Sequence, residues 1–241
     1  MATIVANHKM ELLRDPEDYY WALKSAYPKN RRPETEIVIC PGFLDIGDAN
    51  KSLQKSDIQV GAQNVFWEAS GAFTGEVSGI QLQARGVTHV IITHSERRRL
   101  FRETEATAIK KALALLRLGL KPIICVGEEE NTRNKSDEAA EKFVKQQVAK
   151  ILKGIPKEFW DLLVFAYEPR WAIGTGRTPT EEQIASMMQA IKTVFHGPVL
   201  YGGSVNAENI VEIAEVAPDG VLVGKASLIA KVFIAIIEAY C

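Results

Sequence analysis

A regular alternation of short apolar runs with longer amphipathic stretches is the feature that most constrains the fold of this 241-residue chain. The apolar runs are rich in β-branched residues and mostly continuous, a pattern typical of parallel strands that are buried on both faces. Eight such runs occur, at residues 4–6, 37–40, 58–62, 87–92, 122–126, 162–167, 199–201 and 221–223. The sequence therefore predicts eight parallel strands.

Helix signals lie between these runs. Asp15 and Pro16 are typical of an N-cap and a first-turn proline, and Gly119 is a typical residue just beyond a helix end. The segment 180–183 has the pattern of a capping box. We expect helices over residues 15–26, 106–118, 138–152, from 180 onward, 206–216 and 227–240, and a short or irregular helix within 43–53.

The predicted units have the size of strand–helix repeats, at about 30 residues each. Strict alternation implies a parallel sheet with helices outside it, and eight units can close into a (β/α)8 barrel. A doubly wound open sheet is the main alternative on periodicity alone. No linker divides the chain, so we expect residues 1–241 to form a single domain. In a barrel, the chemistry lies at the carboxyl ends of the strands.

Composition excludes several classes of protein. The chain is 46% apolar and 24% charged, which excludes a disordered chain. No stretch approaches the roughly 20 apolar residues of a membrane span. The net charge of −1, with both signs interspersed, disfavours nucleic acid as a partner but allows small anions. The three cysteines are far apart and lack metal-site spacing, so we expect no zinc site and a reducing, cytoplasmic location.

Residues with chemical functions follow directly after several predicted strands. Asn7 and Lys9 follow the first run, His94 follows the fourth and Glu168 follows the sixth. Glycine-rich turns, at 202–204 and from Gly224, follow the last two. A cation, an imidazole, a carboxylate and two glycine-rich turns would thus meet at one rim of the barrel.

Eight short motifs, in this order, run through the chain: NHKM at 7–10, GAQN at 61–64, SGAFTGE at 70–76, HSERR at 94–98, CVGE at 125–128, AYEPRWAIGTG at 166–176, YGGSV at 201–205 and GVLVGKASL at 220–228. Together they resemble the triosephosphate isomerase family. The resemblance implies a TIM barrel that interconverts D-glyceraldehyde 3-phosphate and dihydroxyacetone phosphate through an enediolate, in glycolysis and gluconeogenesis. It implies neither a metal nor a cofactor.

The resemblance also implies roles for individual residues. Glu168 would be the base that moves the proton between adjacent carbons. His94 would be the electrophile at the oxygens, as a neutral imidazole tuned by a helix N-terminus; this family is itself a standard example of such tuning. Lys9 would stabilise the negative charge, with Asn7 orienting it or the substrate and Glu96 pairing with it.

The phosphate group would be held by backbone N–H groups that the glycine-rich turns direct at it. The residues expected to bind it are Gly174, Ser204, Gly224 and Lys225. Residues 169–177 would form a lid that shields the enediolate from water, because water allows phosphate elimination.

The segment 63–76 is long for a strand–helix connection and contains Phe66, Trp67 and Phe73. Large apolar residues on a protruding loop indicate an interface. The resemblance implies that this loop inserts into a partner subunit through Phe73, Thr74 and Gly75, with Thr74 approaching the partner's active site. We therefore expect a homodimer.

Three residues depart from the family pattern. His8 replaces a usual tryptophan and, by strand alternation, faces away from the site, so we expect it to affect packing. Arg170 stands in the lid where valine is common, and either changes the opening rate or makes a new contact. Lys225 replaces a common glycine. It weakens phosphate binding if the turn needs positive φ, and otherwise adds charge near the phosphate.

Two other functions compete with this interpretation. A phosphosugar epimerase would need metal-binding histidines and aspartates at the strand ends, where only His8 and His94 lie. The other alternative is a catalytically impaired barrel that acts as a binding or assembly protein. Its best support is Lys225, whereas Lys9, His94 and Glu168 are all present.

Overall fold

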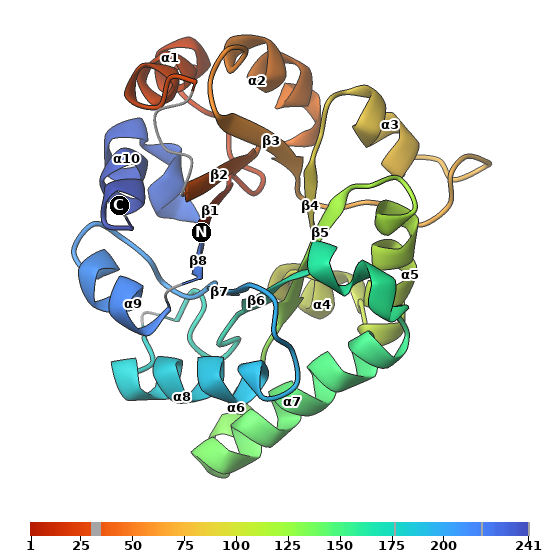
Figure 1. Ribbon diagram of the computed structural model, residues 1–241, viewed down its shortest axis with the longest axis vertical. Helices are drawn as coiled ribbons and strands as arrows, with labels where there is room; N and C mark the ends of the chain where they lie inside the picture. The colour runs from red at the N-terminus through yellow and green to blue at the C-terminus, as the bar shows by residue number, and fades with distance from the viewer. Residues whose placement is uncertain (30–34, 176, 218, 241) are drawn as a thin grey trace.

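The computed structural model describes residues 1–29, 35–175, 177–217 and 219–240. Eight parallel strands form a closed barrel in which each strand pairs with its neighbour in sequence and β8 pairs with β1 (Figure 1). The strands are β1 (Ala2–Asn7), β2 (Thr35–Cys40), β3 (Ile58–Ala62), β4 (His89–Ile92), β5 (Lys121–Val126), β6 (Val164–Tyr167), β7 (Val199–Tyr201) and β8 (Gly220–Val223). The predicted (β/α)8 barrel is confirmed, and the open doubly wound sheet is wrong.

Helices surround the barrel and connect its strands (Figure 1). The α-helices are α1 (Pro16–Ala26), α2 (Ile46–Ser52), α3 (Gly79–Ala84), α4 (Ser95–Phe101), α5 (Glu105–Leu116), α6 (Glu130–Arg133), α7 (Asp137–Lys153), α8 (Glu181–Lys192), α9 (Ile210–Val216) and α10 (Ala230–Glu238). Short 3-10 helices are η1 (Phe43–Asp45), η2 (Lys157–Leu162) and η3 (Lys225–Leu228). Within the described ranges, no helix is both long enough and apolar enough to cross a membrane.

Local side-chain chemistry explains where helices begin. The hydroxyl of Thr180 accepts the N–H of Gln183 in the predicted capping box of α8. The helix expected from Asn206 begins at Ile210 instead, because the Asn206 carboxamide accepts the N–H groups of Glu208 and Asn209 in a turn. The last helix begins at residue 230 and not at 227, since residues 225–228 form η3. Helices α3 and α6, for which the sequence offers little helical periodicity, were not predicted, and α4 was expected only as a helix N-terminus after His94.

Apolar side chains pack in two layers. The barrel interior is filled by ten residues: Val5, Val38, Cys40, Ile91, Ile123, Cys125, Val164, Ala166, Leu200 and Leu222. The alternate residues of the strands, such as Ile4 and Ala6, pack outward in the larger core that the helices cover. Cys125 is a buried packing residue, as predicted. The filled interior leaves only the ends of the barrel for a binding site.

Candidate active site

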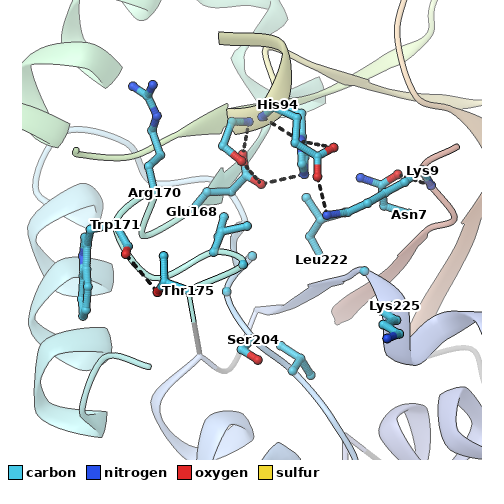
Figure 2. Close-up of a pocket in the computed structure, with 18 of the residues that line it drawn as sticks. Asn7, Lys9, His94, Glu168, Arg170, Trp171, Thr175, Ser204, Leu222 and Lys225 are labelled. Carbon is cyan, nitrogen blue, oxygen red and sulfur yellow. Dashed lines mark hydrogen bonds and ion pairs between the residues drawn. The ribbon is translucent and has the colours of Figure 1, made fainter. Parts of the chain in front are cut away.

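A cavity of about 750 Å³ opens at the carboxyl ends of the strands. All nine residues that the sequence assigns to catalysis, substrate binding and support line this cavity, and Figure 2 shows several of them converging on it. They are Asn7, Lys9, His94, Glu96, Glu168, Gly174, Ser204, Gly224 and Lys225. The three residues of the predicted dimer loop, Phe73, Thr74 and Gly75, are exposed and do not line it.

Lys9 enters the cavity from a strained backbone conformation. Its φ of 53° lies in the left-handed region, which a lysine rarely adopts. The carboxamide oxygen of Asn7 accepts the N–H of Lys9 at 3.0 Å and stabilises this turn. The ammonium group of Lys9 then meets the carboxylate of Glu96, with Nζ 2.6 Å from Oε1 (Figure 2). The expected pairing of Lys9 with Glu96 is therefore present.

The carboxylate of Glu168 is buried, and both of its oxygens accept hydrogen bonds. The backbone N–H of Ser95 donates to Oε2 at 2.7 Å, and the Ser95 hydroxyl donates to Oε1 at 3.2 Å. His94 Nε2 lies 2.8 Å from Oε1 (Figure 2). Ser95 and His94, at the start of α4, thus hold the carboxylate that β6 delivers.

The tautomer of His94 follows from its two contacts. The backbone N–H of Glu96 donates to Nδ1 at 3.2 Å, so Nδ1 of the neutral ring carries a lone pair and Nε2 carries the proton. Burial lowers the pKa of His94, but the facing Glu168 carboxylate outweighs it and raises this pKa above its ordinary value. His94 is also the N-cap of α4, so a helix N-terminus follows it as expected. The expected tuning toward a neutral ring is not found in this arrangement, because the Glu168 carboxylate raises the pKa of His94.

The pKa of Glu168 is set by two opposing effects. Burial would raise it, but the charge and hydrogen bond of His94 and the N–H of Ser95 together hold it below its ordinary value. The carboxylate is therefore ionised where it now rests. The raised pKa that favours proton abstraction from carbon is not found in this arrangement.

Two glycines leave room for Glu168. A Cβ atom at Gly127 would lie 1.7 Å from the backbone oxygen of Glu168, and one at Gly202 would lie 3.0 Å from its Cγ. The N–H of Glu168 donates to the carbonyl of Val126 at 2.8 Å, extending the barrel ladder by one residue. The ends of β5 and β7 thus pack closely against Glu168 where it now rests.

The glycine-rich turns line the same cavity, and their residues Ser204 and Lys225 lie across it from His94 and Glu168 (Figure 2). Gly174 has a φ of +74°, which glycine adopts without strain. A Cβ at Gly224 would lie 3.4 Å from Cε of Lys9, so this turn approaches the lysine closely. Lys225 is not among the residues with positive φ, so the steric penalty considered for it does not arise.

Five residues of the predicted lid, 169–177, line the cavity: Arg170, Trp171, Ile173, Gly174 and Thr175. Gly176 is outside the described residues. The indole N–H of Trp171 donates to the buried carboxylate of Glu128 at 2.8 Å. Arg133 and the hydroxyl of Tyr167 bind the same oxygen, at 2.6 and 3.1 Å. Arg170 forms an ion pair with Glu129 at 2.7 Å. Of the two effects expected for this arginine, the structure thus shows the new contact.

Sequence reasoning missed two residues of this site. Ser95 was quoted within a motif but received no role, although it is the main partner of Glu168. Arg98 is buried and donates to the backbone carbonyls of Thr93 and Cys125, at 3.1 Å each, which ties β4 to β5. The place of Arg98 inside the HSERR motif at 94–98 was the available sequence signal.

His8 lies outside the cavity, as predicted. Its ring is buried, and Nε2 lies 3.0 Å from the hydroxyl of Tyr19. Burial lowers the pKa of His8 to about 4, so the ring is neutral. Among the described residues, no group of three or more His, Cys, Asp or Glu side chains is arranged to hold a metal ion.

Comparisons with known proteins agree with this geometry. A family model described as triosephosphate isomerase matches residues 2–240. The chain is 39% identical over 246 residues to a triosephosphate isomerase of Thermoanaerobacter sp. (strain X514), covering 98% of each chain. It is 42% identical to that of Idiomarina loihiensis, over 87% of this chain and 86% of the relative, and 44% identical to that of Dictyoglomus thermophilum, over 81% and 82%. This chain belongs to the triosephosphate isomerase family.

Proposed function

We propose that the cavity interconverts D-glyceraldehyde 3-phosphate and dihydroxyacetone phosphate through an enediolate, without a metal or a cofactor. The observation that carries this proposal is the convergence of three groups from different strand ends on one cavity: the Glu168 carboxylate, the His94 imidazole and the Lys9 ammonium. Isomerisation of a hydroxy aldehyde to a hydroxy ketone needs a base at carbon and a proton donor at oxygen. The family to which the chain belongs supports the same reaction.

The proton transfers can be written with these groups alone. Glu168 takes a proton from the carbon beside the carbonyl, and the C–H electron pair becomes the C=C bond of the enediolate. The carbonyl electrons move onto oxygen, where the Nε2–H of His94 donates its proton. The ring regains a proton from the neighbouring hydroxyl, whose oxygen becomes the new carbonyl. Glu168 returns its proton to the adjacent carbon, so no oxidant or reductant is consumed.

Glu168 must leave Ser95 to reach substrate, and this movement makes it a stronger base. The Ser95 and His94 contacts lower its pKa, whereas burial raises it. When the carboxylate faces a substrate C–H bond instead, it stays buried but no longer receives the hydrogen bonds that stabilise its ionised form. Substrate binding would therefore raise the pKa of Glu168 toward the value that proton abstraction requires.

The negative charge that develops on the substrate oxygens needs a nearby cation. Lys9 Nζ lies in the cavity and is held by Glu96 at 2.6 Å. A cation that is positioned before the reaction stabilises charge without further reorganisation. We assign Lys9 to this role, and Asn7 to holding the Lys9 turn.

The phosphate would bind to the backbone turns. Gly174, Ser204 and Gly224 line one side of the cavity, and η3 begins directly after Gly224. Backbone N–H groups at such turns bind anions well. Lys225 is exposed at the same turn and lines the cavity, so its ammonium group adds positive charge for the phosphate dianion.

We also propose that the chain forms a homodimer through the segment 63–76, which projects beyond the ring of helices (Figure 1). Many of the large exposed apolar residues lie on the loops and helices that follow β1 to β4: Met10, Leu12, Trp21, Phe43, Leu44, Phe73, Ile80, Leu100 and Phe101. Large exposed apolar residues on a protruding loop support an interface there.

Sedimentation velocity at micromolar concentration tests the assembly. The dimer is expected for the unmodified chain, and Phe73→Glu should convert it to a monomer because the charge enters an apolar contact. Val211→Glu, at an exposed apolar residue of α9, is the matched control and should remain dimeric. A monomer for the unmodified chain would contradict the proposal.

The proposed cellular role is that of a cytoplasmic enzyme of glycolysis and gluconeogenesis. Two cysteines, Cys40 and Cys125, are buried free thiols. Free thiols suit a reducing compartment, which supports this location.

The test of function is steady-state interconversion of the two triose phosphates, followed in both directions in the presence of a chelator. Turnover by the purified chain, lost in a Glu168→Gln variant prepared in parallel, is the expected result. No turnover by folded protein would instead favour the catalytically impaired barrel.

A further inference from the structure

A chain of buried hydrogen bonds joins the end of β1 to the phosphate-binding turn. The hydroxyl of Tyr19, on α1, donates to the backbone carbonyl of Ser227 at 2.7 Å. His8 Nε2 lies 3.0 Å from the same hydroxyl oxygen. A phenol has one proton, which goes to Ser227, so the oxygen accepts and His8 Nε2 carries the donated proton. All three residues are at most 5% exposed.

The chain continues into the turn that lines the active site. The N–H and the hydroxyl of Ser227 both donate to the carbonyl of Gly224, at 2.9 and 2.7 Å. Gly224 and its neighbour Lys225 line the cavity, on the side where the phosphate would bind. Both of these hydrogen bonds come from Ser227, and Tyr19 holds Ser227 through its backbone carbonyl. The geometry of the turn therefore depends on Tyr19.

His8 fixes the orientation of Tyr19. The two rings meet edge to face, with centroids 5.3 Å apart and an interplanar angle of 81°. The backbone N–H of His8 donates to the carbonyl of Cys40 at 3.1 Å, which anchors His8 to the neighbouring strand. A donor to the phenol oxygen also strengthens the hydrogen bond that the same hydroxyl donates onward.

We propose that His8 and Tyr19 are positioning residues for the substrate phosphate, which hold the turn at 224–227 in its binding geometry without contacting substrate. This inference rests on the proposed function, because it takes the phosphate of a triose phosphate to bind at that turn. Neither residue lines the cavity, so their effect reaches the phosphate only through Ser227 and Gly224.

The test separates phosphate binding from the rest of catalysis. Tyr19→Phe removes the hydroxyl and leaves the buried carbonyl of Ser227 without its donor. We expect the KM for glyceraldehyde 3-phosphate and the Kd for inorganic phosphate to rise about fivefold to tenfold, as for one lost buried hydrogen bond. Turnover of glyceraldehyde, which has no phosphate, should stay within about twofold of the unmodified enzyme.

His8 is tested by removal and by rescue. His8→Phe should raise the same two constants in the same direction, by less than Tyr19→Phe. His8→Gln should restore them, because its amide Nε2–H can donate to the Tyr19 oxygen as the imidazole does. A role in packing alone would not distinguish glutamine from phenylalanine in this way.

Tyr20→Phe is the matched control. Tyr20 is the next residue of α1 and is equally buried, but its hydroxyl has no hydrogen-bond partner within the described part of the chain. This variant should leave the phosphate Kd unchanged. An unchanged Kd for Tyr19→Phe would overturn the proposal, and so would an equal loss of glyceraldehyde turnover.

Calorimetric titration of inorganic phosphate keeps this inference separate from the proposed function. It measures binding without turnover, so the comparison of Tyr19→Phe with Tyr20→Phe holds for an inactive protein too. Phosphate binding that weakens only in Tyr19→Phe would support the positioning role even if the isomerase assay failed. An unmodified chain that binds no phosphate would overturn it.

Discussion

At the scale of single residues, the site depends on where the Glu168 carboxylate rests. Its two oxygens are engaged by Ser95 and His94. As the proposed base, Glu168 is thus ionised and buried before substrate arrives, and it must move only from its present donors to the reacting carbon. A base that is positioned in advance loses little entropy when it reacts.

Glu168→Gln should lower kcat by about a hundredfold to ten-thousandfold, the range for a lost general base, while phosphate still binds. The amide keeps the shape and can accept from Ser95, but it cannot take a proton. Steady-state kinetics and phosphate titration measure the two effects. Glu168→Asp, which keeps the charge but shortens the side chain, should lose less. Near-normal turnover of the glutamine variant would show that another group is the base.

Lys225→Gln should weaken the binding of inorganic phosphate by about twofold to fivefold, as expected for one exposed charge. The exposed side chain has no ion pair within the described ranges, so its charge is available to a bound anion. The difference from the unmodified enzyme should shrink as salt is added. Lys231→Gln makes the same change of net charge on α10, away from the cavity, and should not alter binding. Equal effects of the two variants would show that only net charge matters.

At the scale of elements, the lid is anchored by one buried carboxylate. Glu128 is fully buried at the end of β5, and it receives hydrogen bonds from Trp171 of the lid, Tyr167 of β6 and Arg133 of α6. The exposed side of the lid carries a second pair, Arg177 with Glu130 at 2.8 Å. Exposed pairs contribute little, so the Trp171 contact should dominate the lid's position.

Trp171→Phe should divert part of the turnover from isomerisation to phosphate elimination. Without its anchor the lid closes less completely, and water reaches the enediolate. The ratio of inorganic phosphate released to isomer formed measures this diversion. Arg177→Gln, which removes an exposed contact of the same lid, is the comparison and should change the ratio much less. A lower ratio in Trp171→Phe would contradict an anchoring role.

At the scale of the whole molecule, the opposite end of the barrel has its own polar cluster. Glu36 of β2 accepts from Lys121 of β5 at 2.9 Å and from Gln59 of β3 at 3.0 Å, and His89 of β4 lies 3.4 Å away. Burial would raise the pKa of Glu36, but the contacts of His89 and Lys121 outweigh it and lower this pKa to about 2. The hydroxyl of Thr3 of β1 also donates to Glu36, at 3.4 Å, so this one carboxylate connects five strands of the barrel.

This cluster makes the free energy of unfolding depend on pH. Glu36 is ionised above a pKa of about 2 when folded and 4.5 when unfolded, so its contribution is complete above pH 4.5 and is lost as pH falls toward 2. The lost stability is roughly 3 kcal/mol. Glu36→Gln should therefore flatten the urea-unfolding profile over this pH range. Glu158→Gln, at an exposed residue, should keep the profile of the unmodified chain.

The sequence was a good guide to the strands and to the residues that follow them. All eight apolar runs overlap a strand of the structure, because strands that are buried on both faces need continuous apolar residues. The cavity residues were found because each follows directly after a strand or belongs to a motif. Helix starts were less certain. The turn at Asn206 and the 3-10 helix at 225–228 both delay a helix that periodicity alone places earlier.

The sequence by itself determined eight parallel strands and the residues that follow them, because hydrophobic periodicity is a local property. The choice of a barrel over an open sheet came from the resemblance of its motifs to one family. Only the tertiary structure decided what those residues touch. The contact of Ser95 with Glu168 spans 73 positions, and that of Tyr19 with Ser227 spans 208. The direction of each pKa shift depends on such neighbours and on burial. These quantities arise only when the barrel closes and brings distant segments together.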